Sequence, residues 1–232
     1  MIADIVLVES PDEMARQFVR RFLHAARAAV AARRRFACAL TGGSSARLYR
    51  ALHDAELDWE RIELYWGDER AVPPDHADSN FRLARENLID EVPIPEENIH
   101  RMPAEEDDLE AASRLYEEEL PASFDLVHLG MGADGHVCSL FPGHPVLEER
   151  LAHVRPIYDA PKPPPRRLTL TLNALQVARV VLFTVSGPDK ADAVRTAIED
   201  THSQLPAARV AHGPVPVAFL LDRTAGSQLR GH

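Results

Sequence analysis

Short apolar runs alternate along this chain with segments of helical periodicity, and this alternation limits the folds that it can adopt. Strands are predicted at 5–8, 36–40, 62–66, 124–129, 167–172, 180–185 and 215–221. Helices are predicted after Ser10, after 41–45, after Asp78 or Ser79, over 109–120 and after 187–188. The first helix has an expected core face of Met14, Phe18, Phe22 and Ala25. Strands separated by helices indicate an α/β fold, a doubly wound, mainly parallel sheet with helices on both faces. We therefore predict a single domain over residues 1–232.

Composition and charge exclude several classes of protein. The apolar runs are shorter than the roughly 20 residues that a membrane span needs, and the start of the chain has no signal-peptide pattern. The two cysteines, Cys38 and Cys138, form no disulfide framework, so we expect a cytoplasmic location. A formal net charge of −10 disfavours nucleic-acid binding. We expect neither a membrane nor a nucleic-acid partner, and a monomer is the working expectation.

A glycine-rich turn, Thr41-Gly42-Gly43-Ser44-Ser45, lies between a predicted strand and a predicted helix. Glycines let the backbone approach an anion, and a helix start supplies free N–H groups, so this turn is a candidate phosphate site. Equally, it could be a tight turn in which Ser44 or Ser45 caps the helix. It is not a Walker loop, because no Gly-Lys-Ser/Thr follows.

A second glycine-rich segment, residues 130–136, reads Gly-Met-Gly-Ala-Asp-Gly-His after another strand. It matches the dinucleotide pattern G-x-G-x-x-G, but Pro142 and Pro145 interrupt the helix that such a site needs. We therefore expect no nucleotide cofactor. Asp134 and His136 could form an acid–base pair in which the carboxylate orients the imidazole. The alternative is a flexible loop with a solvated histidine.

Charged residues at other element ends are further candidates. Asp68-Glu69-Arg70 follows a strand and could hold and polarise a substrate, or be a surface ion cluster. Arg167 and Lys190 lie near a strand start and a helix start, and each could simply be a solvated charge.

Several other chemistries have no supporting motif. The sequence has no H-E-x-x-H, no C-x-x-C and no carboxylate cluster with metal spacing, so we expect no metal. It has no G-x-S-x-G, so a serine nucleophile of the α/β-hydrolase type is unsupported. The proline-rich run 160–165 is interpreted as a stiff loop within the domain.

Taken together, these motifs resemble the 6-phosphogluconolactonases of the glucosamine-6-phosphate isomerase/6-phosphogluconolactonase family. The resemblance is carried, in the family's order and over nearly the whole chain, by residues 41–44, 66–70, 72–73, 78–80, 130–143, 167–171 and 187–191. The related glucosamine-6-phosphate deaminases carry a glutamate five residues after the loop histidine. Here that position is Phe141, which favours the lactonase interpretation.

The resemblance implies a reaction and a role for each candidate residue. The reaction is hydrolysis of 6-phospho-D-glucono-1,5-lactone, a phosphorylated sugar lactone, without metal or cofactor. His136 is the implied general base, Asp134 orients it, and Arg70 stabilises the oxyanion. The remaining implied substrate contacts are the phosphate-binding residues Thr41, Gly42, Gly43, Ser44, Arg167 and Lys190, together with Asp68 and Gly132. An amino-sugar-phosphate isomerase or deaminase, or a non-catalytic sugar-phosphate sensor, remains as an alternative.

Overall fold

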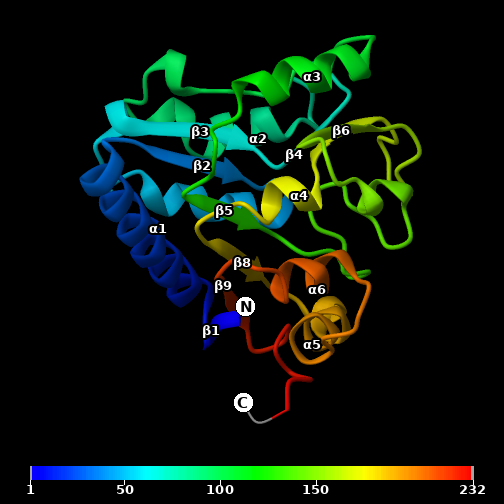
Figure 1. Cartoon of the computed structure of the whole chain (residues 1–232). Coiled ribbons are helices and arrows are strands. Elements are labelled where there is room, and N and C mark those ends of the chain that lie inside the picture. Colours follow the sequence, from blue (N-terminus) through cyan, green and yellow to red (C-terminus); the bar gives the residue numbers. More distant parts are fainter. Residues whose placement is uncertain (1, 231–232) are drawn as a thin grey trace.

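The computed structural model of the chain describes residues 2–230. Within this range, six parallel strands form one sheet in the order β1-β9-β8-β5-β2-β3 (Figure 1). The strands are β1 Ile2–Val8, β2 Phe36–Leu40, β3 Ile62–Trp66, β5 Leu126–Leu129, β8 Val181–Val185 and β9 Val217–Asp222. Every residue of β2 and β8 is buried, as expected for parallel strands that are covered on both faces. The predicted fold class is confirmed, and the domain limits of 1–232 stay a prediction.

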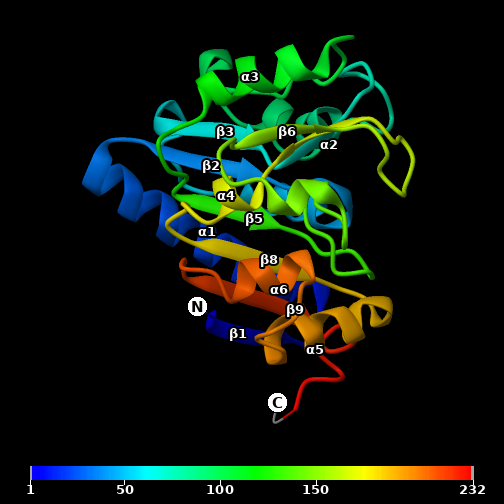
Figure 2. The same cartoon turned by 45° about the vertical axis from the view of Figure 1, so that its right-hand side comes forward.

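Helices cover both faces of this sheet, with α1 behind it and α6 in front in Figure 2. The α-helices are α1 Pro11–Arg33, α2 Asn80–Asn87, α3 Leu109–Glu119, α4 Leu172–Leu175, α5 Ala191–Glu199 and α6 Pro206–Ala211. The 3₁₀ helices are η1 Gly43–Leu52, η2 Trp59–Arg61, η3 Ile89–Glu91, η4 Glu96–Asn98, η5 Pro145–Glu148 and η6 Pro188–Lys190.

Helix α1 shows how the local sequence produces one of these layers. The Ser10 hydroxyl accepts a hydrogen bond from the Glu13 N–H at 3.2 Å, which caps the helix as predicted. Its buried residues are Met14, Phe18, Phe22, Ala26 and Ala29. Ala25 packs half-buried against the core, whereas the helical repeat carries the fully buried face from Phe22 to Ala26.

A smaller antiparallel sheet was not predicted. It is formed, in the order β4-β7-β6, by β4 Asp68–Arg70, β7 Arg167–Leu170 and β6 Val154–Ile157. The predicted strand 167–172 therefore lies outside the parallel sheet, and its last two residues belong to the start of α4. Gly67 joins the two sheets, because its N–H donates to Leu40 O and its carbonyl accepts from Leu170 N. This register sets Arg70 directly opposite Arg167.

The strand order fixes where a ligand site belongs. From β2 the chain continues to β3 on one side, whereas β5 pairs with the other side of β2. Ligands of open α/β sheets bind at such a reversal of strand order, beyond the carboxyl ends of the strands. The glycine-rich segments 41–45 and 130–136 follow β2 and β5 directly, so the topology brings both to this position.

Candidate active site

A cleft of about 290 Å³ lies where the two glycine-rich segments meet. The Gly130 N–H donates to Thr41 Oγ1 at 3.1 Å and joins the segments. The predicted residues that line the cleft are Thr41, Gly42, Gly43, Ser44, Asp68, Arg70, Gly132, His136, Arg167 and Lys190. Asp134 adjoins it through His136. The tertiary structure therefore gathers these residues from five separate segments of the sequence.

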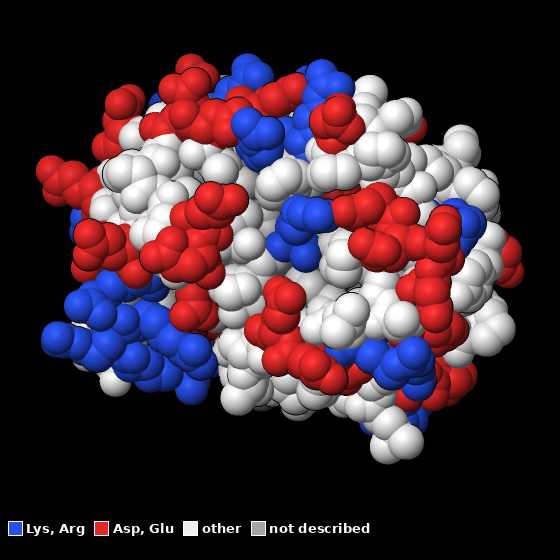
Figure 3. Space-filling model, turned by 90° about the horizontal axis from the view of Figure 1, so that it is seen from above, with Lys and Arg blue, Asp and Glu red and all other residues white. Residues whose placement is uncertain are grey.

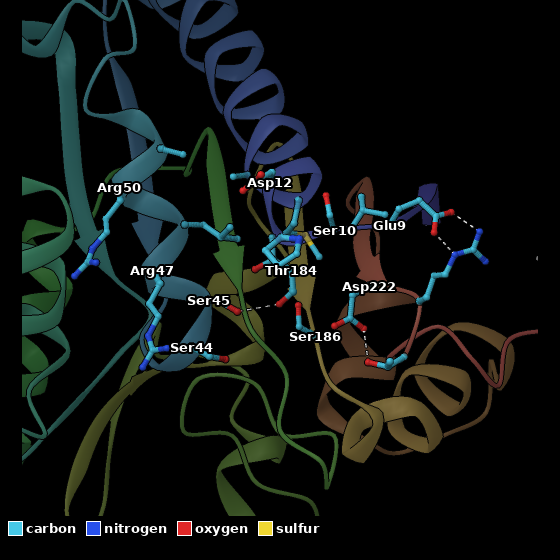
Figure 4. Close-up of a pocket in the computed structure, with 18 residues that line it drawn as sticks. Glu9, Ser10, Asp12, Ser44, Ser45, Arg47, Arg50, Thr184, Ser186 and Asp222 are labelled. Atoms are coloured by element: carbon cyan, nitrogen blue, oxygen red, sulfur yellow. Dashed lines mark hydrogen bonds and ion pairs between the residues drawn. The ribbon is translucent and has the colours of Figure 1, made fainter.

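A larger cavity of about 570 Å³ lies beside the first turn and shares Ser44 and Ser45 with the cleft (Figure 4). It lies at the carboxyl ends of β1, β8 and β9. The described residues that line it include no histidine. We place the candidate site in the smaller cleft, because it is lined by His136 and by the predicted cations Arg70, Arg167 and Lys190.

His136 and Asp134 form a close pair. His136 Nδ1 lies 2.5 Å from Asp134 Oδ1, which assigns the Nδ1 proton to this hydrogen bond. The lone pair of the neutral ring is then on Nε2. Gly132 makes room for the pair, because a Cβ there would lie 2.0 Å from His136 Nδ1 and 2.5 Å from Asp134 Oδ1. The Phe141 ring packs against the imidazole, with 4.8 Å between the ring centroids.

Burial and charge act in opposite directions on this pair. Burial lowers the pKa of His136 below its ordinary value, although the hydrogen bond to Asp134 pulls it upward. Burial by itself would raise the pKa of Asp134, but its contacts with His136 and Lys162 outweigh burial and lower it. Near neutral pH the pair is thus a neutral imidazole beside a carboxylate, which is the state that a general base requires.

Lys162 is a functional candidate that the sequence analysis missed. Its Nζ lies 3.5 Å from both Asp134 Oδ1 and His136 Nδ1. Arg167 holds its loop in place: Nε donates to Pro164 O and Nη2 donates to Lys162 O. The only signal in the sequence was a lysine among prolines at 161–165.

Arg167 is more enclosed than the sequence suggested. Its side chain is buried, and burial lowers its pKa. The guanidinium of Arg167 binds loop carbonyls and so positions Lys162. Arg167 also lines the cleft, where it contributes positive charge. Arg70 lies opposite it and donates through Nη1 to Asp78 O at 2.7 Å. Asp68 Oδ2 lies 3.8 Å from Arg167 Nη1, so this carboxylate already offsets part of the positive charge of the two arginines.

Asp68 and Glu69 are both buried but have different partners. Asp68 accepts hydrogen bonds from Ser139 Oγ at 2.6 Å and Asn80 Nδ2 at 3.1 Å, and it lines the cleft. Glu69 accepts from the backbone N–H groups of Asn80 and Phe81 at the start of α2. Glu69 therefore anchors α2, whereas Asp68 is the carboxylate that faces the cleft.

The first glycine-rich turn starts a 3₁₀ helix. Gly42 is its N-cap residue and Gly43 is its first residue, with φ of 64°. The alternative in which Ser44 or Ser45 caps the helix is therefore wrong. Asn80 packs against Gly42 so closely that a Cβ there would lie 1.9 Å from Asn80 Oδ1. Position 42 therefore has no room for a side chain unless Asn80 moves, and the left-handed φ of Gly43 favours glycine there.

Comparison with known proteins places the chain in a family. Residues 9–217 match the family described as glucosamine-6-phosphate isomerases/6-phosphogluconolactonase. The chain belongs to this family. It is 39% identical over 245 residues to the 6-phosphogluconolactonase of Mycobacterium tuberculosis, with 99% of each chain covered. It is 42% identical over 213 residues to the human 6-phosphogluconolactonase, covering 85% of this chain and 82% of the relative.

Solved structures of the family agree with the fold. The 6-phosphogluconolactonase of Trypanosoma brucei superimposes with a TM-score of 0.88 at 28% identity, over 98% of both chains. A monomeric glucosamine-6-phosphate deaminase gives a TM-score of 0.81 at 22% identity, which shows a shared fold alone. The resemblance to the lactonase family predicted from the sequence is confirmed.

Two features are absent from residues 2–230, the part of the chain that the structure describes. No described helix is long and apolar enough to cross a membrane. The same residues contain no group of three or more His, Cys, Asp or Glu placed to hold a metal ion. The metal-free reaction, the cytoplasmic location and the monomeric state stay predictions.

Proposed function

We propose that this protein hydrolyses 6-phospho-D-glucono-1,5-lactone to 6-phospho-D-gluconate in the oxidative pentose phosphate pathway. The observation that carries the proposal is the His136–Asp134 pair in one cleft with a glycine-rich turn and several cations. The names of these two relatives support the same substrate.

His136 would act first as a base and then as an acid. Its Nε2 takes a proton from a water molecule, whose oxygen bonds to C1 of the lactone. The carbonyl electron pair moves onto oxygen and forms a tetrahedral oxyanion. When this intermediate collapses, the bond between C1 and the ring oxygen breaks, and the imidazolium returns the proton to that oxygen. Asp134 stabilises the imidazolium through the 2.5 Å hydrogen bond.

Positive charge near the pair would stabilise the oxyanion. Arg70 lines the cleft, and the glycine-rich loops present backbone N–H groups there. Lys162, 3.5 Å from His136 Nδ1, adds a third source of positive charge. Because the product is a carboxylate, these cations also favour the anionic product state.

The phosphate would bind at the first turn. Thr41, Gly42, Gly43 and Ser44 line the cleft at the start of η1, where backbone N–H groups are available. Lys190 at the end of η6 and the buried Arg167 add positive charge. This local charge is needed because the protein has a net charge of −10. Figure 3 shows acidic side chains spread in groups over one face of the molecule.

Phe141 favours lactone hydrolysis over deamination. Deamination with ring opening needs a second proton-transfer group near the histidine. The structure has the Phe141 ring against the imidazole, and a phenyl ring transfers no proton.

A proton-release assay on freshly made phosphorylated lactone, with the spontaneous rate subtracted, tests the proposal. Enzyme-dependent acid release that forms 6-phosphogluconate is the expected result. Ammonia release from glucosamine 6-phosphate would instead indicate a deaminase. Binding of 6-phosphogluconate without lactone turnover would indicate a sensor.

A further inference from the structure

A buried polar cluster lies beneath the first glycine-rich turn. It consists of Tyr49 from η1, His128 from β5 and Thr184 from β8. Tyr49 Oη lies 2.9 Å from His128 Nδ1, and His128 Nε2 lies 2.8 Å from Thr184 Oγ1. Tyr49 and His128 are 0% exposed and Thr184 is 3% exposed, so these groups satisfy one another away from water.

The neutral ring of His128 has two possible tautomers, and the hydrogen bonds of Tyr49 select between them. Burial lowers the pKa of His128 to about 3, so the ring is neutral near pH 7 and has one donor and one acceptor. Because the Tyr49 hydroxyl donates to Thr41 O, we assign the ring proton to Nδ1, which donates to Tyr49 Oη, while Nε2 accepts from the Thr184 hydroxyl. Tyr49 then keeps its own proton for a further partner.

That further partner is the backbone of the turn. Tyr49 Oη accepts from the Thr41 N–H at 2.8 Å and donates to Thr41 O at 3.2 Å. At the other end of the turn, Ser45 Oγ donates to Thr184 O at 2.9 Å (Figure 4). The cluster therefore holds the Thr41 end of the segment 41–45, and the backbone of β8 holds the Ser45 end.

Tyr49 and His128 are shielded from any substrate, whereas Thr184 lines the larger cavity beside the turn. The Phe18 ring from α1 packs against His128 at 4.9 Å and against Tyr49 at 5.9 Å, measured between ring centroids. Since Tyr49 and His128 have no exposed surface, they touch no ligand, and Tyr49 acts on the cleft through its hydrogen bonds to the turn. Tyr49 and His128 are therefore positioning residues and not catalytic residues.

We propose that the buried polar cluster positions the turn for phosphate and so sets the preference for a phosphorylated over an unphosphorylated lactone. This inference rests on the proposed function, in which the turn receives the phosphate. A backbone held in place before the ligand arrives loses little freedom on binding, and its N–H groups already point toward the anion. Loosening the Thr41 end of the turn should therefore weaken the binding of phosphate more than it slows the chemical step at His136.

Tyr49→Phe is the most direct test, because it removes the hydroxyl between Thr41 and His128 and keeps the ring. The KM for the phosphorylated lactone should rise roughly tenfold, since a buried N–H loses its partner. The kcat, and the kinetics with unphosphorylated gluconolactone, should change less than about twofold. Inorganic phosphate should inhibit the variant roughly tenfold more weakly.

Tyr116→Phe is the matched control. Tyr116 is also 0% exposed, and its hydroxyl accepts from Trp66 N at 2.9 Å and donates to His100 O at 3.2 Å. Both variants remove one hydroxyl from a fully buried tyrosine, but the hydroxyl of Tyr116 contacts the end of β3 and not the turn. Tyr116→Phe should lower the melting temperature similarly and leave the ratio of kcat/KM for the two lactones unchanged.

Thr184→Val and Thr184→Ser give a second test that does not depend on Tyr49→Phe folding. Valine removes the hydroxyl and should reduce the lactone preference, whereas serine keeps it and should restore the preference. An unchanged preference in folded Tyr49→Phe and Thr184→Val, or an equal loss in Tyr116→Phe, would overturn the inference. If the wild type itself does not discriminate between the two lactones, the phosphate site and this inference both fail.

Discussion

Asp134→Asn removes the negative charge of Asp134 and keeps the shape of its side chain. The amide has nearly the same size as the carboxylate, and its oxygen can still accept the Nδ1 proton of His136. The tautomer of the imidazole is therefore retained. What is lost is the attraction of a carboxylate, 2.5 Å away, for the imidazolium that forms as water attacks.

The size of the effect follows from the geometry and the exposure. Hydrogen bonds to charged groups contribute about 1.5–3 kcal/mol. The Asp134 side chain is 37% exposed, so solvent screening favours the lower end of this range. A loss of about 1.4 kcal/mol corresponds to a roughly tenfold lower kcat. The KM should change less than about twofold, because the charge matters mainly in the transition state.

The pH profile gives an independent readout with a defined sign. Burial lowers the pKa of His136, and Asp134 pulls it upward. Removing the carboxylate lets the pKa of His136 fall further. The decrease in kcat/KM that protonation of this base causes should therefore begin at a lower pH than in the wild type. Lys162→Met is the matched variant, and it should shift the pH profile in the opposite direction. Because Lys162 lowers the pKa of His136, its removal should move the acid limb of the profile to higher pH.

The assay is proton release in weakly buffered solution across pH, with spontaneous hydrolysis subtracted and imidazole titration followed by NMR. The reasoning is refuted if Asp134→Asn keeps kcat within twofold with an unmoved acid limb. It is also refuted if the Asp134 and Lys162 variants shift the limb in the same direction.

Three further predictions use the same assay. His136→Ala should lower kcat by roughly 10²–10⁴ with little change in KM, and a folded variant of near-normal kcat would exclude the base role. Gly132→Ala should lower kcat about 10²-fold, because the new Cβ displaces the imidazole, and unchanged activity would contradict the close approach. Lys190→Ala should reduce kcat/KM about tenfold for the phosphorylated lactone alone, and equal losses on both lactones would remove it from the phosphate site.

The sequence by itself determined the local elements and the positions of the chemistry-bearing turns. Apolar runs and helical spacing depend on short-range periodicity, so α1 and the strands of the parallel sheet could be predicted to within a few residues. Glycines after β2 and β5 marked the ends of these strands, and parallel topology implies that such ends share one edge.

Only the tertiary structure decided what depends on contacts between distant segments. The run at 167–172 was predictable as a strand, but its pairing with β4 follows from the turn at Gly67. Lys162 reaches His136 because the guanidinium of Arg167 binds the carbonyls of its loop. His128 joins partners 79 and 56 residues away in sequence. Sequence periodicity carries no information about such pairs, since burial of the whole core selects them.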